Sequence, residues 1–439
     1  MTTALTFRAR ILRADTGAEV ALEHLGQTSG QPMVWSLDDR GRMVPQKLAG
    51  VVPAGSQEVF IVRFASGRMV EATGETELST LGGPVRVDAL RLDGRVAAPR
   101  RVPSPLATQP MVDDEIILLA HLIGDGSCVK RQPIRYASID ELSLRAVAMA
   151  AKHFGVTAKR DDYPAARVTT LRLPAPYHLT HGRRNPVAAW LDSMGLFGKR
   201  SYEKFVPAAV FTAPNGQVAL FLRHLWATDG CVVWDSKQRQ ARIYYGSTSR
   251  QLINDVRQLL LRFGIPTRVY CAPKAGYRDY WFLNVYGVGN QRRFLRDIDL
   301  HGVKFFAARE VLTKLASVQS NENVDTVPRE VWDQVRQQLT EQGMSHRAFA
   351  AAMNTRFCGS AMWKPSPTRG RLHRVAAILN DRGLHDLTNN DVFWDKIVEI
   401  TSAGEQDTYA VTVAGAQNFV VNGISVSATH GDDAINPAN

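Results

Sequence analysis

The sequence of 439 residues predicts a multidomain protein in which an all-β domain, split into two segments, is interrupted by an α+β insertion with pseudo-two-fold symmetry and accompanied by a small helical module. Three observations predict this arrangement. Short strand-like runs separated by turn residues occupy both ends of the chain. The middle is rich in helical patterns, and part of it is repeated. A β domain with a large insertion explains this order of elements most economically.

Length and composition limit the class of protein. At ~150 residues per domain the chain has room for two to four domains. Its 45% apolar and 22% charged residues describe an ordinary globular protein. No apolar run approaches the ~18 residues that span a bilayer, and the N-terminus carries no secretory signal. The four cysteines are too scattered for a disulfide framework or a cysteine-based zinc site. We therefore expect a cytoplasmic protein with no membrane partner.

The chain is strongly basic, with a formal net charge of +11 and a pI of about 9.6. Such an excess favours a polyanionic partner, most often nucleic acid. A basic protein without any such partner remains the alternative at this point.

Both ends of the chain consist of short strand-like runs separated by turns. Residues 33–37, 57–64 and 69–73 are short apolar runs bounded by glycine-containing turns, which is typical of a barrel or sandwich. Residues 408–413 and 418–426 resume this pattern near the C-terminus. The linkers are the proline-rich residues 100–105 and the polar residues 317–324. The domain boundaries predicted in this way are residues 4–108 and 390–429 for the two parts of the β domain, 109–316 for the insertion with repeats at about 115–215 and 216–316, and 325–385 for the helical module.

The repeat inside the insertion carries the chemistry. Tyr136-Ala-Ser and the later Phe154-Gly are matched, in both cases 109 residues further on, by Tyr245-Gly-Ser and Phe263-Gly. Upstream of each copy lies an apolar helix that ends in Asp-Gly. These helices are Leu118-Leu-Ala-His-Leu-Ile-Gly-Asp-Gly126 and Leu222-Arg-His-Leu-Trp-Ala-Thr-Asp-Gly230. A duplicated unit implies pseudo-two-fold symmetry, which physically matches a pseudo-symmetric DNA site.

The repeat places Asp125 and Asp229 at two helix C-termini. A carboxylate there faces the negative end of the helix dipole, and two such groups side by side repel each other. A divalent cation resolves this, and hard oxygen ligands favour Mg²⁺, which can activate water and neutralise a phosphodiester transition state. Taken singly, an Asp-Gly after an apolar helix is a common and purely structural helix stop. Its repetition favours the functional interpretation.

These paired motifs resemble those of the LAGLIDADG homing endonucleases, although only the Asp-Gly matches the family's name. The resemblance implies that Asp125 and Asp229 are a metal-binding catalytic pair that cuts long sites in double-stranded DNA. It also implies two or three Mg²⁺ ions at the shared carboxylates, with Mn²⁺ as a substitute, and a monomer with internal symmetry. Basic residues near the groove would be Lys274 and Lys159; the alternative is that both are phosphate-contacting or solvated turn lysines.

For DNA binding we expect a groove lined by strands of both repeats. Each basic residue alone could equally be a solvated surface charge. The candidates are Lys130, Arg131, Arg135, Arg160, Arg167, Arg172, Lys237, Arg239, Arg242, Arg268 and Arg278. The module at 325–385, with its basic residues 364–371, is a second possible DNA contact of helix-turn-helix type; without a specific motif, it can also be a plain helical domain.

The β ends resemble the Hint splicing domain of inteins, in the version found in replicative DNA helicases of actinobacterial type. Residues 4–17, 34–38 and 66–73 look like the N-terminal splicing blocks, and 394–426 like the C-terminal ones. The resemblance covers about residues 4–429, including the helical module.

The departures from the intein pattern fall on its chemistry. Splicing needs a cysteine or serine at the first intein position, which here is Ala4. The Thr-x-x-His element reads Thr73-Gly-Glu-Thr76, so its histidine is missing. The expected aspartate is Ala410, and the His-Asn-Phe element begins with Gln417. The terminal His-Asn reads Ser427-Ala428, which leaves only Thr429 as a downstream nucleophile.

We therefore predict a site-specific, metal-dependent DNA endonuclease on an intein-derived scaffold that no longer splices. Two alternatives remain: a splicing intein captured in an inactivated form, and a non-catalytic DNA-binding relic. Designed inactivation needs only the changes at Ala4 and Ala428, so the further losses favour natural decay, although an engineered chain is not excluded. The short flanks indicate a free-standing chain that begins at its own Met1.

Overall fold

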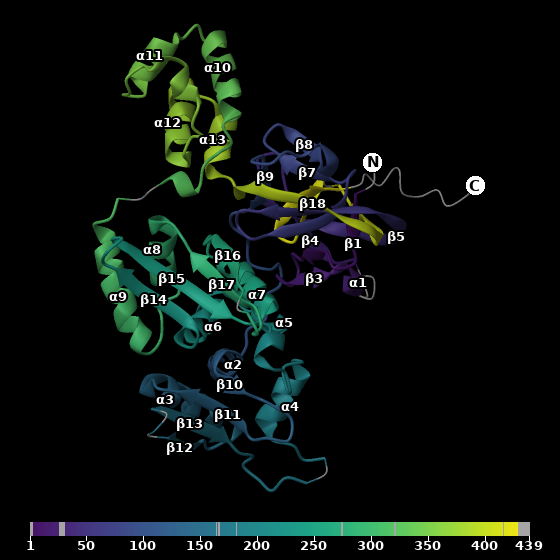
Figure 1. Ribbon diagram of the computed structural model, residues 1–439, viewed down its shortest axis with the longest axis vertical. Helices are drawn as coiled ribbons and strands as arrows, with labels where there is room; N and C mark the ends of the chain where they lie inside the picture. The colour runs from purple at the N-terminus through teal and green to yellow at the C-terminus, as the bar shows by residue number, and fades with distance from the viewer. Residues whose placement is uncertain are drawn as a thin grey trace, which may run out of the picture. The chain divides into compact units, whose positions relative to one another are not determined.

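The computed structural model describes residues 3–25, 31–163, 165, 167–180, 182–273, 275–319, 322–415 and 417–428. The chain divides into two compact units, shown in Figure 1. We call Met1–Asp15, Glu19–Pro103 and Asn321–Asn439 the β unit, and Thr16–Ala18 and Ser104–Ser320 the repeat unit. No helix in the described part of the chain is long and apolar enough to cross a membrane.

The β unit is built on two six-stranded sheets, ordered β4-β5-β6-β1-β18-β9 and β3-β2-β19-β20-β7-β8. Their strands are β1 (Ala4–Thr6), β2 (Arg10–Leu12), β3 (Glu19–Ala21), β4 (Met33–Leu37), β5 (Met43–Phe64), β6 (Met69–Thr73), β7 (Glu77–Thr80), β8 (Gly83–Arg86), β9 (Arg95–Pro99), β18 (Val392–Val413), β19 (Asn418–Val421) and β20 (Ile424–Ser427).

Strands from the two ends of the chain pair throughout the β unit. The strands β5 and β18, of 22 residues each, run antiparallel along one another. In the first sheet Ala4 of β1 pairs with Ala410 of β18, and in the second Val426 of β20 pairs with Leu78 of β7. The buried side chains of both segments form a single apolar core. Each of the two sheets therefore contains strands from the segment before residue 103 and strands from the segment that begins at residue 392.

Four helices lie between these strand segments, in the helical module of the β unit. They are α10 (Val331–Glu341), α11 (His346–Ala352), α12 (Arg369–Leu379) and α13 (Arg382–Asn389). Ser345, Thr368 and Asp381 cap the last three by accepting a hydrogen bond from a backbone N–H of the first turn. The fully buried Trp332 and Phe349 both contact Trp363, so aromatic packing stabilises the module.

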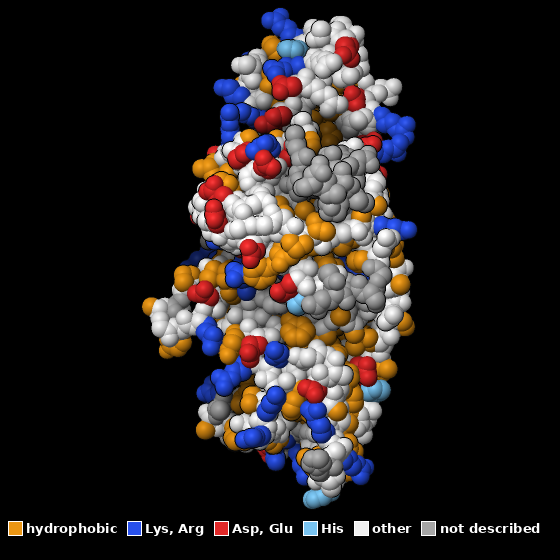
Figure 2. All heavy atoms as spheres, turned by 90° about the vertical axis from the view of Figure 1, so that its right-hand side faces the viewer, with side chains coloured by type: hydrophobic (Ala, Val, Ile, Leu, Met, Phe, Trp, Pro, Cys, Tyr) orange, Lys and Arg blue, Asp and Glu red, His pale blue; other side chains and the backbone are white. Residues whose placement is uncertain are grey.

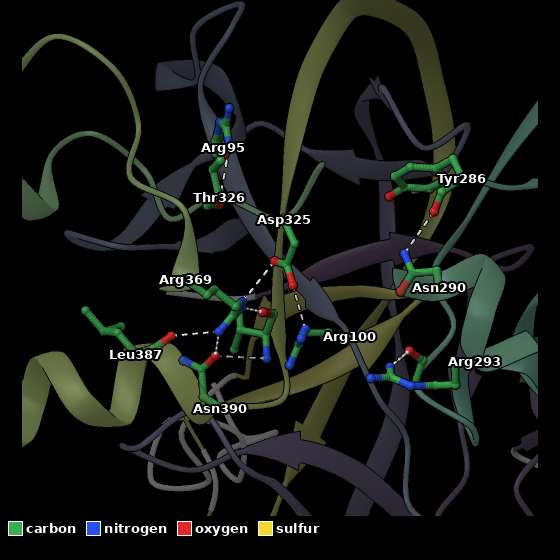
Figure 3. Close-up of polar contacts among 12 residues, drawn as sticks. Arg95, Arg100, Tyr286, Asn290, Arg293, Asp325, Thr326, Arg369, Leu387 and Asn390 are labelled. Carbon is green, nitrogen blue, oxygen red and sulfur yellow. Dashed lines mark hydrogen bonds and ion pairs between the residues drawn. The ribbon is translucent and has the colours of Figure 1, made fainter. Parts of the chain in front are cut away.

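Asp325 ties the start of this module to the strands (Figure 3). One carboxylate oxygen accepts from Arg100 Nε at 2.6 Å and the other from Arg369 Nε at 2.9 Å. The Arg369 guanidinium also donates to the carbonyl oxygens of Leu387 and Val392. Because Arg369 is almost fully buried, these partners are needed to offset the loss of its hydration.

The repeat unit contains two sheets with the same strand order, β10-β11-β13-β12 and β14-β15-β17-β16. In each copy an apolar helix precedes the first strand and an amphipathic helix follows the second. The first copy comprises α2 (Asp113–Gly124), β10 (Gly126–Ser127), β11 (Ile134–Ser138), α3 (Glu141–Ala150), β12 (Lys159–Tyr163), β13 (Val168–Leu173) and α4 (Pro186–Ser193). Next come α5 (Ala208–Thr212), α6 (Asn215–Ala227), β14 (Gly230–Asp235), β15 (Gln240–Ser247), α7 (Arg250–Leu261), β16 (Thr267–Ala272), β17 (Tyr280–Val285), α8 (Val288–Asp297) and α9 (Val303–Ala316).

The repeated sequence signals have the same structural role in both copies. Asp140 and Ser249 are the N-caps of α3 and α7 and accept from the backbone N–H groups of Leu142 and Leu252. After these helices the chain turns at Gly155 and Gly264, which have φ of 68° and 63°. Side chains rarely adopt this left-handed conformation, which explains the repeated Phe-Gly pair.

Candidate active site

The helices α2 and α6 are in close contact at their C-terminal ends. A Cβ atom on Gly124 would lie 2.0 Å from Thr228 Oγ1, which is far inside van der Waals contact. The absence of a side chain at Gly124 therefore allows the two helix ends to meet. The residues that follow, Asp125 and Asp229, are consequently neighbours.

Both aspartates remain open to solvent while the helices that carry them are buried. Asp125 is the C-cap of α2, and its backbone N–H donates to the carbonyl of His121 at 3.0 Å. Asp229 follows the C-cap of α6, Thr228. The geometry thus presents two accessible carboxylates on a rigid, apolar base.

The surroundings disfavour the ionised form of both carboxyl groups. Partial burial by neighbouring protein atoms, followed by the negative charge of Asp229, raises the pKa of Asp125 from 3.8 to about 6. Partial burial likewise raises the pKa of Asp229. The positive charges of Lys304 and Lys204 act in the opposite direction on both. A divalent cation between these groups would offset the same repulsion, and two carboxylates are the donor type that Mg²⁺ prefers.

Lys204 and Lys304 are the site residues that sequence reasoning missed. Lys204 Nζ donates to the carbonyl oxygens of Leu122, Ile123, Gly124 and Gly126 at 2.7–3.2 Å, at the end of α2. Lys304 Nζ does the same at the end of α6.

The partners of Lys304 are the carbonyls of Trp226, Ala227 and Thr228. Each ammonium group therefore neutralises the negative end of one helix dipole beside one aspartate. Each lysine is also followed by phenylalanine, and this repeated Lys-Phe pair is the sequence feature that could have identified the two lysines as equivalent residues of the repeats.

Of the two lysines chosen from the sequence, the structure describes only Lys159, which does not join this site. Lys159 begins the edge strand β12 and is exposed, and it is not among the cations that act on the two aspartates. Its selection as a catalytic residue is therefore not supported by the geometry. Lys274 lies outside the described residues.

Several predicted DNA-binding residues lie on one open sheet face. The register places Arg135, Arg172 and Lys159 at paired positions of β11, β13 and β12, so their side chains share a face. In the second sheet Arg268 shares a face with Tyr244, because both pair with Asn284. Figure 2 shows Lys and Arg side chains spread over one side of the chain, with Asp and Glu side chains between them.

The structure contradicts the groove position expected for Arg160. It pairs with Leu171, whose other partner is the fully buried Tyr136, so Arg160 belongs to the helix-covered face. There it forms ion pairs with Glu141 and Asp162. The prediction failed because faces alternate along a strand, and only the register decides which residue faces which way.

Other members of the predicted set lie in turns or already have protein partners. Arg172 is paired with Asp161 at 2.8 Å and Arg242 with Asp235. Arg278 and Arg268 lie over the rings of Tyr202 and Tyr286, at 3.6 and 4.4 Å from the centroids. The residues outside helices and strands are Lys130, Arg131, Arg167, Lys237, Arg239 and Arg278.

The positions that matched the splicing blocks also come together, in the β unit. Ala4 is buried, its N–H donates to Thr76 Oγ1 at 3.2 Å, and the Thr76 hydroxyl donates to the carbonyl of Ala4 at 3.0 Å. Thr73 Oγ1 lies 3.0 Å from the same hydroxyl.

The C-terminal splicing positions meet this cluster. Thr3 donates to the carbonyl of Ser427, and the N–H of Ala428 donates to the carbonyl of Gln417 at 2.9 Å. Thr429 lies outside the described residues.

Comparison with known proteins supports the relationships inferred from the motifs. Residues 216–299, which include the second apolar helix and its sheet, match the family described as the LAGLIDADG-like domain. The chain is 34% identical over 427 residues to the replicative DNA helicase DnaB of Synechocystis sp., an alignment that covers 96% of this chain and 49% of the helicase. The chain thus spans about half the length of that relative. The actinobacterial type stays a prediction.

Two solved structures resemble parts of the chain. A DnaB intein from Synechocystis sp. PCC 6803 is 26% identical, with 23% of this chain and 70% of that chain covered and a TM-score of 0.22. Variants of the homing endonuclease I-DmoI are 13% identical, with 45% of this chain and 97% of that chain covered and a TM-score of 0.33.

Proposed function

We propose that this chain is a homing endonuclease of the LAGLIDADG class carried on an intein scaffold, that it makes metal-dependent double-strand breaks at a specific DNA site, and that it no longer splices. One observation carries the proposal: two helix ends from duplicated sheet-bearing units bring Asp125 and Asp229 together as accessible carboxylates. A purely structural helix stop does not require a second carboxylate beside it.

Asp125 and Asp229 would hold Mg²⁺ through their carboxylate oxygens. The ion would polarise a phosphate oxygen and lower the pKa of a bound water. The chain's own contribution is positioning and charge balance. Lys204 and Lys304 bind the carbonyl oxygens at both helix ends and thereby keep the two aspartates closer to ionisation. The apolar helices α2 and α6 fix the separation of the carboxylates.

Double-stranded DNA is the substrate that best fits the chain. The +11 charge favours a polyanion, and the open sheet face with Arg135 and Arg172 offers phosphate contacts beside strand side chains that can reach base edges. Two copies of one sheet topology suit two half-sites of a DNA sequence.

Loss of splicing is supported by what occupies the splice positions. A buried Ala4 offers no nucleophile, and the hydroxyl of Thr76 occupies the position where the family has a histidine. Ala428 has no side-chain amide that could cyclise. The similarity to replicative helicases over 96% of the chain favours descent from a splicing intein, which is the second candidate function.

Incubation with DNA tests the proposal. The substrate is the uninterrupted helicase gene segment at the position where related inteins lie, with Mg²⁺ present. We expect a double-strand break at a single site and none without the divalent ion. Tight, sequence-specific binding without cleavage in Mg²⁺ or Mn²⁺ would instead indicate a DNA-binding relic.

A further inference from the structure

Three histidines of the repeat unit converge one helical turn below the two aspartates. His121 lies on α2, four residues before Asp125, and His224 lies on α6, five residues before Asp229. His301 lies between α8 and α9. One ligand nitrogen from each of the three lies within 4.8 Å of the others. Segments that are far apart in the sequence therefore bring three imidazoles to one point in the apolar core.

The hydrogen bonds of this cluster are incomplete. His121 Nδ1 lies 3.0 Å from the Tyr136 hydroxyl, and His121 Nε2 lies 3.0 Å from His224 Nδ1. His301 Nε2 is buried and has no hydrogen-bond partner among the described residues. Leaving a buried polar nitrogen unpaired is costly, so its persistence among two other imidazoles points to a ligand shared by all three.

We propose that His121, His224 and His301 bind one Zn²⁺ or a similar borderline transition-metal ion, at a site separate from the carboxylate pair. Imidazole nitrogen suits such ions, whereas Mg²⁺ prefers oxygen. Two nitrogens bound tetrahedrally at ~2.0–2.1 Å lie about 3.3 Å apart, so the 3.0 Å between His121 Nε2 and His224 Nδ1 needs only a small adjustment. A fourth, non-protein ligand would complete the tetrahedron.

Neighbouring groups already hold the rings in place. Tyr136 is fully buried, and its hydroxyl oxygen can accept from His121 Nδ1–H, which leaves Nε2 for the metal. His301 is followed by Gly302, with φ of 70°, where a Cβ atom would lie 1.9 Å from Asp140 Oδ2. Asp140 also accepts from the backbone N–H of Val303 at 3.3 Å. Asp140 thus fixes the loop just after His301.

A metal ion here would cross-link three segments of the repeat unit. It would join α2 to α6 directly and would fix the loop just before Lys304, which binds the end of α6. The ion would therefore be structural, and its binding does not depend on whether the chain cleaves DNA.

The test is a metal titration of the full chain without a histidine tag. Protein stripped with a chelator is dialysed against ZnCl₂, and bound zinc is counted by elemental analysis. We expect about one ion per chain and a rise in melting temperature of roughly 5 °C or more in excess zinc. CoCl₂ in place of zinc should give the visible absorption of tetrahedral Co²⁺.

Matched variants locate the ion. His301→Gln and His224→Gln should lose the zinc, while His178→Gln, which changes an exposed histidine of the same unit, should keep it. The double variant Asp125→Ala/Asp229→Ala should also keep it. The proposal would be overturned if the double aspartate variant lost the zinc while His301→Gln retained it. It would also be overturned if the wild-type chain bound less than ~0.1 zinc ion per chain.

Circular dichroism shows which variants fold. If the histidine variants do not fold, the wild-type Co²⁺ spectrum decides. An octahedral spectrum, or none, contradicts the proposed tetrahedral histidine site. Failure of DNA cleavage leaves all of these readouts unchanged, so the two proposals are tested separately.

Discussion

At the scale of single residues, the site is defined by an unfavourable charge arrangement. Partial burial makes both Asp125 and Asp229 harder to ionise, the charge of Asp229 adds to this at Asp125, and Lys204 and Lys304 compensate only in part. In the absence of metal, such a site costs stability at neutral pH. This is expected of residues that serve binding rather than folding.

Asp125→Asn should stabilise the metal-free protein at pH 7.5. The pKa of Asp125 is about 6 in the folded chain and 3.8 ordinarily. Above pH 6, Asp125 is ionised in both the folded and the unfolded state, but its ionisation costs more free energy in the folded state, and this difference destabilises the protein. As the pH falls towards 4, the folded state takes up the proton and the destabilisation disappears. Because the side chain is exposed, solvent screening reduces the gain to roughly 1 kcal/mol.

Urea denaturation at pH 7.5 and pH 4 measures this gain. It should be present at the higher pH and near zero at the lower. Asp114→Asn, an exposed change in the first turn of the same helix, is the control and should shift the free energy of unfolding by less than ~0.5 kcal/mol at either pH. Destabilisation of Asp125→Asn at pH 7.5 would contradict the electrostatic argument.

At the scale of elements, the contact between α2 and α6 determines whether a site exists. Gly124→Ala places a methyl group against the Thr228 side chain. We expect a loss of ~2 kcal/mol or more in the free energy of unfolding, because the helices must separate. Gly216→Ala, on α6 where nothing lies within 4 Å, should be neutral or slightly stabilising. Thermal denaturation compares the two; equal stabilities would refute the close approach.

The same scale shows what the sequence could and could not predict. The repeated Asp-Gly pairs predicted the ends of the two apolar helices, because a helix stop is a local signal. Lys204 and Lys304 reach the helix ends from distant segments, so the Lys-Phe pair that they share did not show which groups they bind. The side of the sheet occupied by Arg160 depends on strand register, which a one-residue change reverses.

Surface charge on the first sheet gives a matched pair of DNA-binding tests. Arg135→Ala should weaken binding to every DNA sequence. Because one phosphate contact is lost, the slope of log affinity against log salt concentration should become shallower by about one. Arg160→Ala should have little effect, because that guanidinium is held by Glu141 and Asp162 on the other face. Affinity measured across a salt series distinguishes the two. A larger effect of Arg160→Ala would place the DNA on the opposite side.

At the scale of the whole molecule, the β unit brings together residues from both ends of the chain at the positions that resemble the splicing blocks. Strands from both chain ends still bring Ala4, Thr76 and Ser427 into one hydrogen-bonded cluster. The scaffold was predictable from strand patterns at the two ends. Its pairing register was not, because it depends on contacts between residues some 400 positions apart.

Restoring the chemistry should therefore restore peptide-bond cleavage. The combined changes Ala4→Cys, Thr76→His, Ser427→His and Ala428→Asn return a nucleophile, a polarising imidazole and a cyclising amide to positions that already adjoin. Mass spectrometry should detect release of residues 429–439, and the same variant with Ala428 left unchanged should not release them. An intact chain in both would indicate that the scaffold has also lost its splicing geometry.

The most direct test of the central claim is the Mg²⁺ dependence of DNA cleavage in three variants. Asp125→Asn and Asp229→Asn keep the size of the side chain but remove a metal-binding carboxylate, and Asp114→Asn removes a charge elsewhere on α2. We predict that both site variants still bind the target DNA but no longer make double-strand breaks at any Mg²⁺ concentration, while Asp114→Asn cuts like the wild type. Cleavage by the wild type that survives in Asp125→Asn or Asp229→Asn would contradict the shared carboxylate site.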